Sequence, residues 1–235
     1  MGIRGSRILY KAMADSSQPI SIHNLPRQIL LFMVRGAILL PKAKLPLPIF
    51  DSSHVSMISD CLTGNRLLGL VQPSASLRMG VDLDDLSVFQ IGCLAKVIDV
   101  TEPEEGKLVA ELEGVARFRL LDQTTGADGY PLATVDYASF ASDLIDEIDF
   151  TMDRPRLYKA LKPYFDRLDI SPNWDEINKT SNHRLLTALS MACPLPPSEK
   201  QALLEVESIQ EQSHVMTALI EMAAFDRQPD HVIYH

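Results

Sequence analysis

Two long apolar runs joined by a short polar turn constrain the fold of this chain more than any other feature. The runs are residues 91–100 and 107–121, and the turn between them is Glu102-Pro103-Glu104-Glu105-Gly106. Proline presets φ and glycine permits positive φ, so this turn has the chemistry of a hairpin loop. We therefore predict a β-hairpin over residues 91–121.

The second arm of this hairpin alternates between apolar and polar residues. Residues 107–113 place leucine and alanine on one face and charged side chains on the other, as a half-buried strand does. Gly114 interrupts the pattern, which is typical of a bulge or bend. Beyond it, Ala116, Phe118 and Leu120 share one face, and Arg117 and Arg119 share the other. We interpret Phe118 as a core residue.

Other short apolar runs in the first half of the chain predict further strands. They are residues 29–33, 37–40, 66–72 and 132–140, together with Leu45-Pro46-Leu47-Pro48-Ile49-Phe50. Pro46 and Pro48 each lack a backbone donor, so this last run can only be an edge or irregular strand. Several short strands separated by turn residues predict a small barrel or sandwich.

From Ser142 onward the sequence pattern becomes helical. Apolar residues recur every three or four positions in residues 156–168 and 174–192. We expect a last helix that begins at Ser198 as N-cap, with Gln201 completing a capping box, and that runs through Ile220. The fold class is therefore α+β, a β half followed by a helical half. We divide the chain into an N-terminal extension (1–26), a β domain (27–141), a helical subdomain (142–225) and a tail (226–235).

The composition indicates a globular protein that is not a general nucleic-acid binder. Of the 235 residues 46% are hydrophobic, and the net charge is −9, whereas phosphate neutralisation needs a basic face. Cys61, Cys93 and Cys193 lie too far apart for paired metal ligands, so we expect buried thiols in a reducing compartment. No run reaches the roughly 20 apolar residues that a spanning helix needs. We therefore expect a cytoplasmic protein without a membrane segment.

The first residues of the chain are basic. Arg4, Arg7 and Lys11 lie in a stretch without acidic residues, which is a weak feature of transit peptides. The alternative is that Met13 is the natural start and that residues 1–12 are upstream sequence. We predict the second.

Motifs for catalysis or metal binding are absent from the sequence. Gly64 and Gly69 have the spacing of a phosphate-binding loop, but Leu70-Val71 stand where Lys and Ser or Thr are required. Neither Gly-x-Ser-x-Gly nor His-Glu-x-x-His occurs. We interpret the aspartates at 82–85 as a solvated loop, the acidic residues between 143 and 153 as a linker and helix N-terminus, and His231 and His235 as part of a tail. We expect no catalytic residue, metal ion or cofactor.

Three blocks of the sequence resemble the N-terminal, substrate-binding domain of the Lon protease family. They are residues 38–50 with 68–73, residues 91–97 with 112–119, and residues 185–192 with 198–205, in the family's order. The resemblance implies a PUA-like β pseudobarrel followed by a helical bundle, and recognition of protein substrates without catalysis. The sequence contains no ATPase motor and no Ser/Lys peptidase segment, so we expect a free-standing member of the family.

One departure from the family pattern follows Ile49-Phe50. The family usually continues with Glu-Pro-Arg-Tyr, whereas this chain continues with Asp51-Ser52-Ser53-His54. The acid is kept in shortened form, and the arginine and tyrosine are missing.

Our leading hypothesis is a module that binds unfolded or peptide segments of other proteins and cooperates with a proteolytic machine. The predicted binding surface is apolar and lies near Pro46, Pro48 and Phe50, aided by Arg117 or Arg119. The alternative is that Phe50 belongs to the core and that the prolines only blunt an edge strand. Two other functions stay open: a small hydrolase with a cleft between barrel and helices, and a PUA-like protein that binds RNA.

Overall fold

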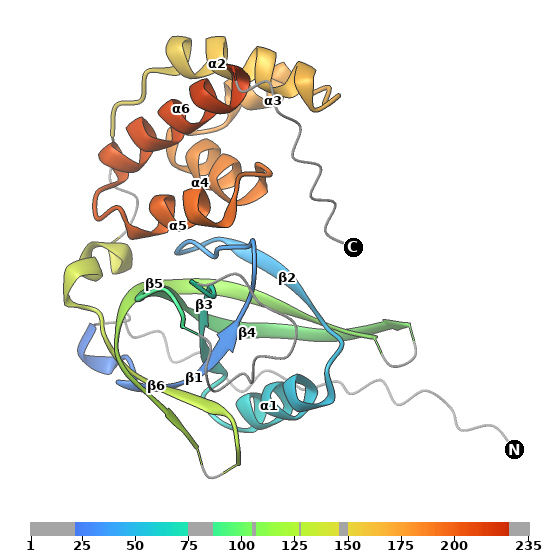
Figure 1. Ribbon diagram of the computed structural model, residues 1–235, viewed down its shortest axis with the longest axis vertical. Coiled ribbons are helices and arrows are strands. Elements are labelled where there is room, and N and C mark those ends of the chain that lie inside the picture. The colour runs from blue at the N-terminus through green and yellow to red at the C-terminus, as the bar shows by residue number, and fades with distance from the viewer. Residues whose placement is uncertain (1–21, 75–86, 105–106, 127, 146–149, 226–235) are drawn as a thin grey trace, which may run out of the picture.

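A six-stranded sheet forms a near-closed ring in the first part of the chain. The computed structural model describes residues 22–74, 87–104, 107–126, 128–145 and 150–225 (Figure 1). The strands are β1 (Gln28–Met33), β2 (Lys44–Ile49), β3 (Leu67–Val71), β4 (Ile91–Glu104), β5 (Lys107–Thr125) and β6 (Pro131–Asp136). Their order is β2-β5-β4-β3-β1-β6, and β5 also pairs with β6, which brings the two ends of the sheet together. Among the described strands, β1 and β3 form the one parallel pair.

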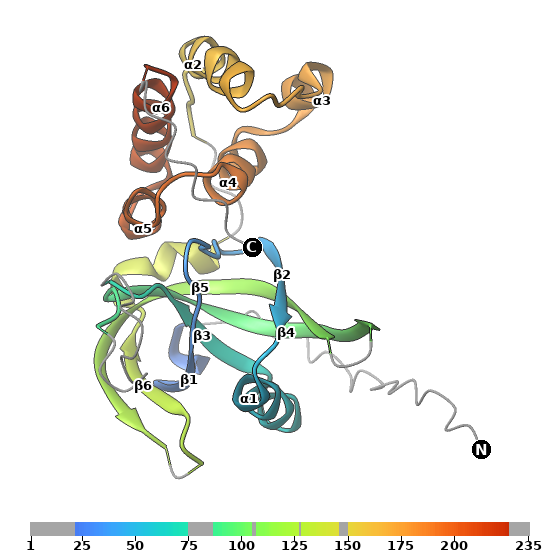
Figure 2. The same cartoon turned by 45° about the vertical axis from the view of Figure 1, so that its right-hand side comes forward.

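The helices that follow β6 pack on one end of the sheet. They are η3 (Ala138–Leu144), α2 (Arg154–Arg167), α3 (Trp174–Lys179), α4 (Asn182–Ala192), α5 (Pro197–Glu205) and α6 (Ile209–Phe225). Of the other helical segments, η1 (Ile22–Asn24) precedes β1, and α1 (Ser52–Thr63) connects β2 to β3. In both views α5 lies beside the sheet, whereas α1 lies at the opposite end of the ring (Figures 1 and 2). The predicted fold class, an α+β pseudobarrel followed by helices, is confirmed.

The predicted hairpin is the longest pairing in the sheet. β5 pairs with β2 along its first part and with β6 along its last part. Opposite β4, the register shifts between Leu94 and Ala95, so that Val115 is the extra residue of a bulge next to Gly114. A Cβ atom on Gly114 would lie 2.2 Å from the carbonyl oxygen of Leu40. The bulge expected at this glycine is confirmed, and the close approach of the Leu40 backbone leaves no room for a side chain there.

The segment before β2 is buried between the barrel and the helices. Ile38 and Leu40 pack into the helical core, and Leu39 packs into the barrel core. The segment is not a strand, contrary to prediction, because its backbone turns toward Gly114 instead of pairing along a neighbour. Phe118 is fully buried in the barrel, as predicted.

The helix boundaries differ from the sequence prediction at three places. Helix α1 was not expected. The helix predicted over residues 174–192 is two helices, because the side chain of Ser181 accepts from the N–H of Arg184 and starts α4. The helix predicted from Ser198 starts at Pro197 without a side-chain cap, and it is interrupted after Glu205. Gln201 cannot reach back to Ser198, because its amide is buried and donates to the carbonyl oxygen of Ile91.

Several predicted features lie outside the described residues. They are most of the N-terminal extension, the aspartates at 82–85, the centre of the hairpin turn, the acidic residues at 146–149 and the tail with His231 and His235. In the part of the chain that is described, no helix is long and apolar enough to cross a membrane.

Candidate functional site

The outward side of β2 carries an exposed apolar row. Side chains alternate along this strand, so Leu47 and Ile49 enter the barrel core while Pro46 and Pro48 face outward. Phe50 continues the outward series at the end of the strand and is 75% exposed. The core assignment of Phe50 is therefore wrong, and its side chain lies at the surface, as the binding hypothesis requires.

Neighbouring strands extend this row into a two-dimensional surface. Pro48 lies opposite Val109 of β5, which lies opposite Thr101 of β4. In the adjacent row Pro46 lies opposite Glu111, which lies opposite Asp99. Directly opposed residues project from the same face of a sheet. We call the face formed by Pro46, Pro48, Phe50, Val109, Thr101, Glu111 and Asp99 the outer sheet face.

The prolines also determine what the edge of β2 can bind. β2 stands at the end of the strand order and pairs, among the described strands, with β5 alone. Since proline has no N–H, the ladder to β5 must use Leu45, Leu47 and Ile49, and the N–H positions of Pro46 and Pro48 fall on the free edge. That edge offers carbonyl acceptors without donors at these two residues. A peptide strand added there would lack half of its hydrogen bonds.

Phe50 is held at the junction between β2 and α1. Asp51 is the N-cap of α1, and its Oδ1 accepts from the backbone N–H of Ser53 at 2.8 Å and from the Ser53 hydroxyl at 2.6 Å. These bonds lower the pKa of the Asp51 carboxyl. The acid that is kept after Ile49-Phe50 therefore starts a helix, and it fixes the backbone on which Phe50 is presented.

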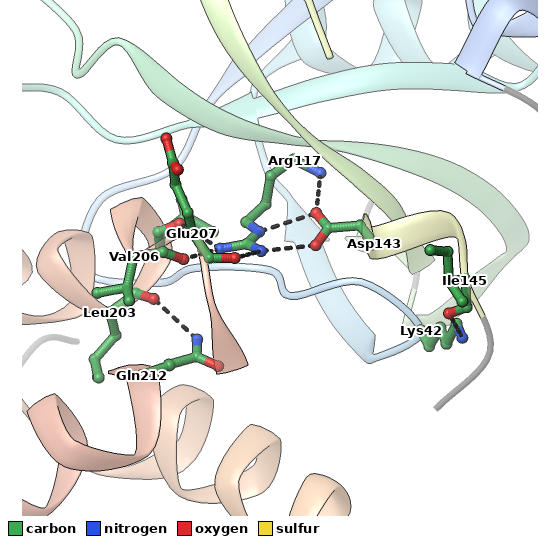
Figure 3. Close-up of polar contacts among 9 residues, drawn as sticks. Lys42, Arg117, Asp143, Ile145, Leu203, Val206, Glu207 and Gln212 are labelled. Carbon is green, nitrogen blue, oxygen red and sulfur yellow. Dashed lines mark hydrogen bonds and ion pairs between the residues drawn. The ribbon is translucent and has the colours of Figure 1, made fainter. Parts of the chain in front are cut away.

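Arg117 lies in a buried polar cluster between the barrel and the helices (Figure 3). Its Nη2 and Nε donate to the two carboxylate oxygens of Asp143 in η3, at 2.7 and 2.9 Å. The same guanidinium donates to the carbonyl oxygens of Leu204, in the last turn of α5, and of Val206 and Glu207, which follow the helix. Its central carbon lies 4.5 Å from the centre of the Phe140 ring. With 6% of its surface exposed, Arg117 has no donor to offer a peptide.

Arg119 lies far from the outer sheet face. It is half-buried near the other end of β5, and its Nη1 donates weakly to Gln90 Oε1 at 3.5 Å. The strand between Val109 and Arg119 spans roughly 30 Å at about 3.3 Å per residue. The predicted site residues therefore fall into separate places: Pro46, Pro48 and Phe50 together, and the two arginines elsewhere.

Hydrogen bonds and apolar contacts join the barrel to the helices. Besides the Arg117 cluster, Gln72 Nε2 donates to Gln201 Oε1 and to the carbonyl oxygen of Pro197, each at 3.1 Å. The hydrolase alternative placed a cleft at this contact, where these hydrogen bonds instead join the residue after β3 to α5. A polar hollow of about 480 Å³ lies at the turn between α3 and α4. No group of three His, Cys, Asp or Glu side chains in the described part of the chain could hold a metal ion.

Sequence reasoning missed two residues of these sites. Asp143 was interpreted as part of an acidic linker, and no local pattern links it to Arg117, 26 residues earlier. Asp99 has no local sequence signal beyond the alternation of β4, because its place on the outer sheet face depends on its pairing with Glu111 across the hairpin.

A family model and two curated relatives all link this chain to Lon proteases. The family model described as the ATP-dependent protease La (LON) substrate-binding domain matches residues 28–221. A Lon protease from Desulfosudis oleivorans is 27% identical over 95 residues, which are 40% of this chain and 12% of that protein. A Lon protease from Flavobacterium johnsoniae is 21% identical over 206 residues, 85% of this chain and 24% of that protein. The chain thus spans a quarter or less of these relatives' length.

Solved structures of isolated Lon N-terminal domains have the same fold. A Lon N-terminal domain protein from Xanthomonas campestris matches with a TM-score of 0.54 and 18% identity, over 81% of this chain and 97% of that one. The N-terminal domain of a Mycobacterium avium complex Lon protease matches with a TM-score of 0.57 and 18% identity, over 82% and 97%. At this identity the likeness establishes the pseudobarrel and its following helices.

Proposed function

This chain belongs to the Lon substrate-binding domain family, and on that premise we propose that it binds unfolded or extended segments of other proteins without catalysing a reaction. The outer sheet face is the proposed binding surface. Within these 235 residues we find no motif of an ATPase motor or a peptidase, so we propose that their role is recognition and that degradation is carried out by a proteolytic machine.

The exposure of Phe50 is the observation that carries this proposal. A large aromatic side chain that is 75% exposed, on an ordered strand–helix junction and beside two prolines and a valine, makes a continuous apolar surface. Burying such a side chain fully is worth about 1.5–3 kcal/mol, so covering it with a partner is favourable. Aromatic anchors of this kind dominate protein recognition sites.

The geometry favours docking of side chains on the face over addition of a strand at the edge. The missing donors at Pro46 and Pro48 make the free edge of β2 a poor template for a ladder. A segment that lies across the face can still bury its apolar side chains on Phe50 and Pro48. The chemistry of the face therefore suits extended, apolar segments that a folded protein would keep inside.

A competition experiment tests the proposal. A fluorescently labelled polypeptide, kept unfolded by reduction and alkylation of its disulfides, is titrated with the full chain and followed by anisotropy. We expect saturable binding in the micromolar range that unlabelled unfolded polypeptide displaces and the same polypeptide in its native, disulfide-bonded form does not. No anisotropy change, or equal competition by the native form, would overturn the proposal.

A further inference from the structure

We propose that the outer sheet face selects segments in which a large apolar side chain lies two residues away from a lysine or arginine. This inference rests on the proposed function and names the substrate class of that same surface. Three observations support it: an apolar half of the face, an acidic half beside it, and the spacing between the two.

The apolar half is formed where β2 ends. Phe50 and Pro48 project outward from consecutive outward positions of β2, and Val109 lies opposite Pro48 on β5. Val109 is half-buried and the other two are exposed. An aromatic or long aliphatic side chain placed on this group would bury apolar surface on three sides.

The acidic half is the adjacent cross-strand row. Asp99 and Glu111 are directly opposed on β4 and β5, and both project outward. Like charges in this position repel each other. Lys44 Nζ lies 3.3 Å from Glu111 Oε1, but all three side chains are at the surface. A cation from a partner, placed over the row, would reduce the remaining repulsion.

Asp99 is held in a fixed position for such a contact. Its Oδ1 accepts from the backbone N–H of Val100 at 2.9 Å, next to the bulge that shifts the register between Val97 and Asp99. The hydrogen bond uses one of the two carboxylate oxygens of Asp99. A preorganised carboxylate loses less side-chain entropy when it pairs with a cation.

The distance between the two halves matches an extended peptide. The rows are two residues apart on each strand, about 6.6–7 Å, which is also the separation of side chains i and i+2 in an extended chain. Residue i+1 of the bound segment would then point to solvent. Because the cation and the apolar group are related only by this spacing, the lysine or arginine can stand before or after the apolar residue.

The expected preference is modest because the acidic row is solvent-exposed. Exposed ion pairs contribute a few tenths to about 1 kcal/mol, which corresponds to roughly two- to fivefold in the dissociation constant. High salt screens such a pair and leaves apolar contacts intact. The selectivity should therefore disappear at high ionic strength while binding itself persists.

Short labelled peptides that differ at one position test this inference. Three peptides share a phenylalanine in a neutral, polar background and carry lysine, glutamine or glutamate two residues from it. Each is titrated by anisotropy with the full-length chain and with Asp99→Asn/Glu111→Gln. The matched control is Asp166→Asn/Glu176→Gln, which removes the same two charges from exposed positions on the helices. Both variants are checked for an unchanged unfolding midpoint.

We expect affinity to fall in the order lysine, glutamine, glutamate, with the order kept in the control and lost in Asp99→Asn/Glu111→Gln. Equal affinities for the three peptides, or equal loss of selectivity in both variants, would overturn this inference and leave the proposed function standing. If none of the peptides binds while an unfolded polypeptide does, the inference is overturned as well. Failure of both kinds of ligand would overturn the proposed function.

Discussion

Arg117 and Asp143 form a buried, two-pronged ion pair that joins the barrel to the connection leading into the helices. The side chains are 8% and 7% exposed, and Nη2 and Oδ1 are 2.7 Å apart. The backbone N–H of Arg117 also donates to Asp143 at 2.9 Å. The remaining guanidinium N–H groups donate to backbone carbonyl oxygens at the C-terminal end of α5 and just beyond it. One side chain therefore contacts both the barrel and the helices (Figure 3). This arrangement makes the pair a structural element of the domain contact.

Replacing Arg117 by methionine should destabilise the protein strongly. The substitution leaves the Asp143 carboxylate buried without its cation, and breaking a buried pair costs about 3–5 kcal/mol. Urea denaturation followed by far-UV circular dichroism measures the loss. The control is Arg156→Met, which breaks the exposed pair with Glu221 and should cost less than about 1 kcal/mol. Equal effects of the two substitutions would contradict the structural role of Arg117.

Gly114→Ala should also destabilise the barrel. Its new methyl group would lie 2.2 Å from the Leu40 carbonyl oxygen, so the segment before β2 must move away. Overpacking of this kind costs typically about 1–3 kcal/mol. At Gly64 the nearest atom is 3.6 Å away, so Gly64→Ala serves as the matched control and should change the thermal midpoint little. A midpoint for Gly114→Ala that equals the control would show that the close approach is absent.

The three buried cysteines should make stability depend on pH in the alkaline range. Burial raises the pKa of Cys61 and of Cys193 to about 11, and it raises the pKa of Cys93 as well. Unfolded thiols ionise near pH 9, so their contribution to stability is complete below that pH and is lost as pH rises toward 11. Urea midpoints at pH 7, 9 and 10.5 measure this loss of stability.

Alkylation tests the burial of the same three thiols. Iodoacetamide at pH 8 should modify the unfolded chain and spare the native one. Rapid alkylation of the native protein would contradict this burial.

Restoring donors to the edge of β2 should promote self-association. In Pro46→Thr/Pro48→Thr the free edge gains two N–H groups and becomes a template for pairing with a second copy. Sedimentation velocity should then show a larger share of dimers or larger species than for the original chain. Pro172→Thr, which lies outside the sheet, is the control. A double variant that sediments like the original chain would show that the prolines do not protect this edge.

Local patterns in the sequence predicted the parts of the fold that depend on neighbouring residues. The alternation of apolar and polar residues predicted the hairpin, and the missing N–H groups of Pro46 and Pro48 predicted an edge strand. The structure confirms both. The alternation of side chains along β2 also predicts that Phe50 faces outward, because Leu47 and Ile49 face inward. A phenylalanine in an apolar run is nevertheless more often a core residue, and this residue type therefore favours the core assignment.

Features that depend on distant residues could not be predicted in the same way. The partner of Arg117 is set by where η3 packs, and the burial of Gln201 is set by the contact with β4. In both cases a polar residue that suits a surface or a cap is placed inside by tertiary contacts. The acidic row of the outer sheet face likewise needs the register of β4 against β5.

The most direct test of the account is whether Phe50 carries the binding of unfolded polypeptide. Phe50→Ser removes the aromatic side chain from the outer sheet face. Leu121→Ser removes an apolar side chain that is 60% exposed on the far part of β5, outside the proposed surface. Both substitutions are at exposed positions, so neither should lower the unfolding midpoint appreciably.

The measurement is the dissociation constant of the labelled unfolded polypeptide for the original chain and for each variant, by anisotropy. We predict that Phe50→Ser weakens binding by about tenfold or more, as loss of an anchor worth roughly 1.5–3 kcal/mol requires. Leu121→Ser should bind as the original chain does. Equal affinities of the original chain and Phe50→Ser would contradict the account.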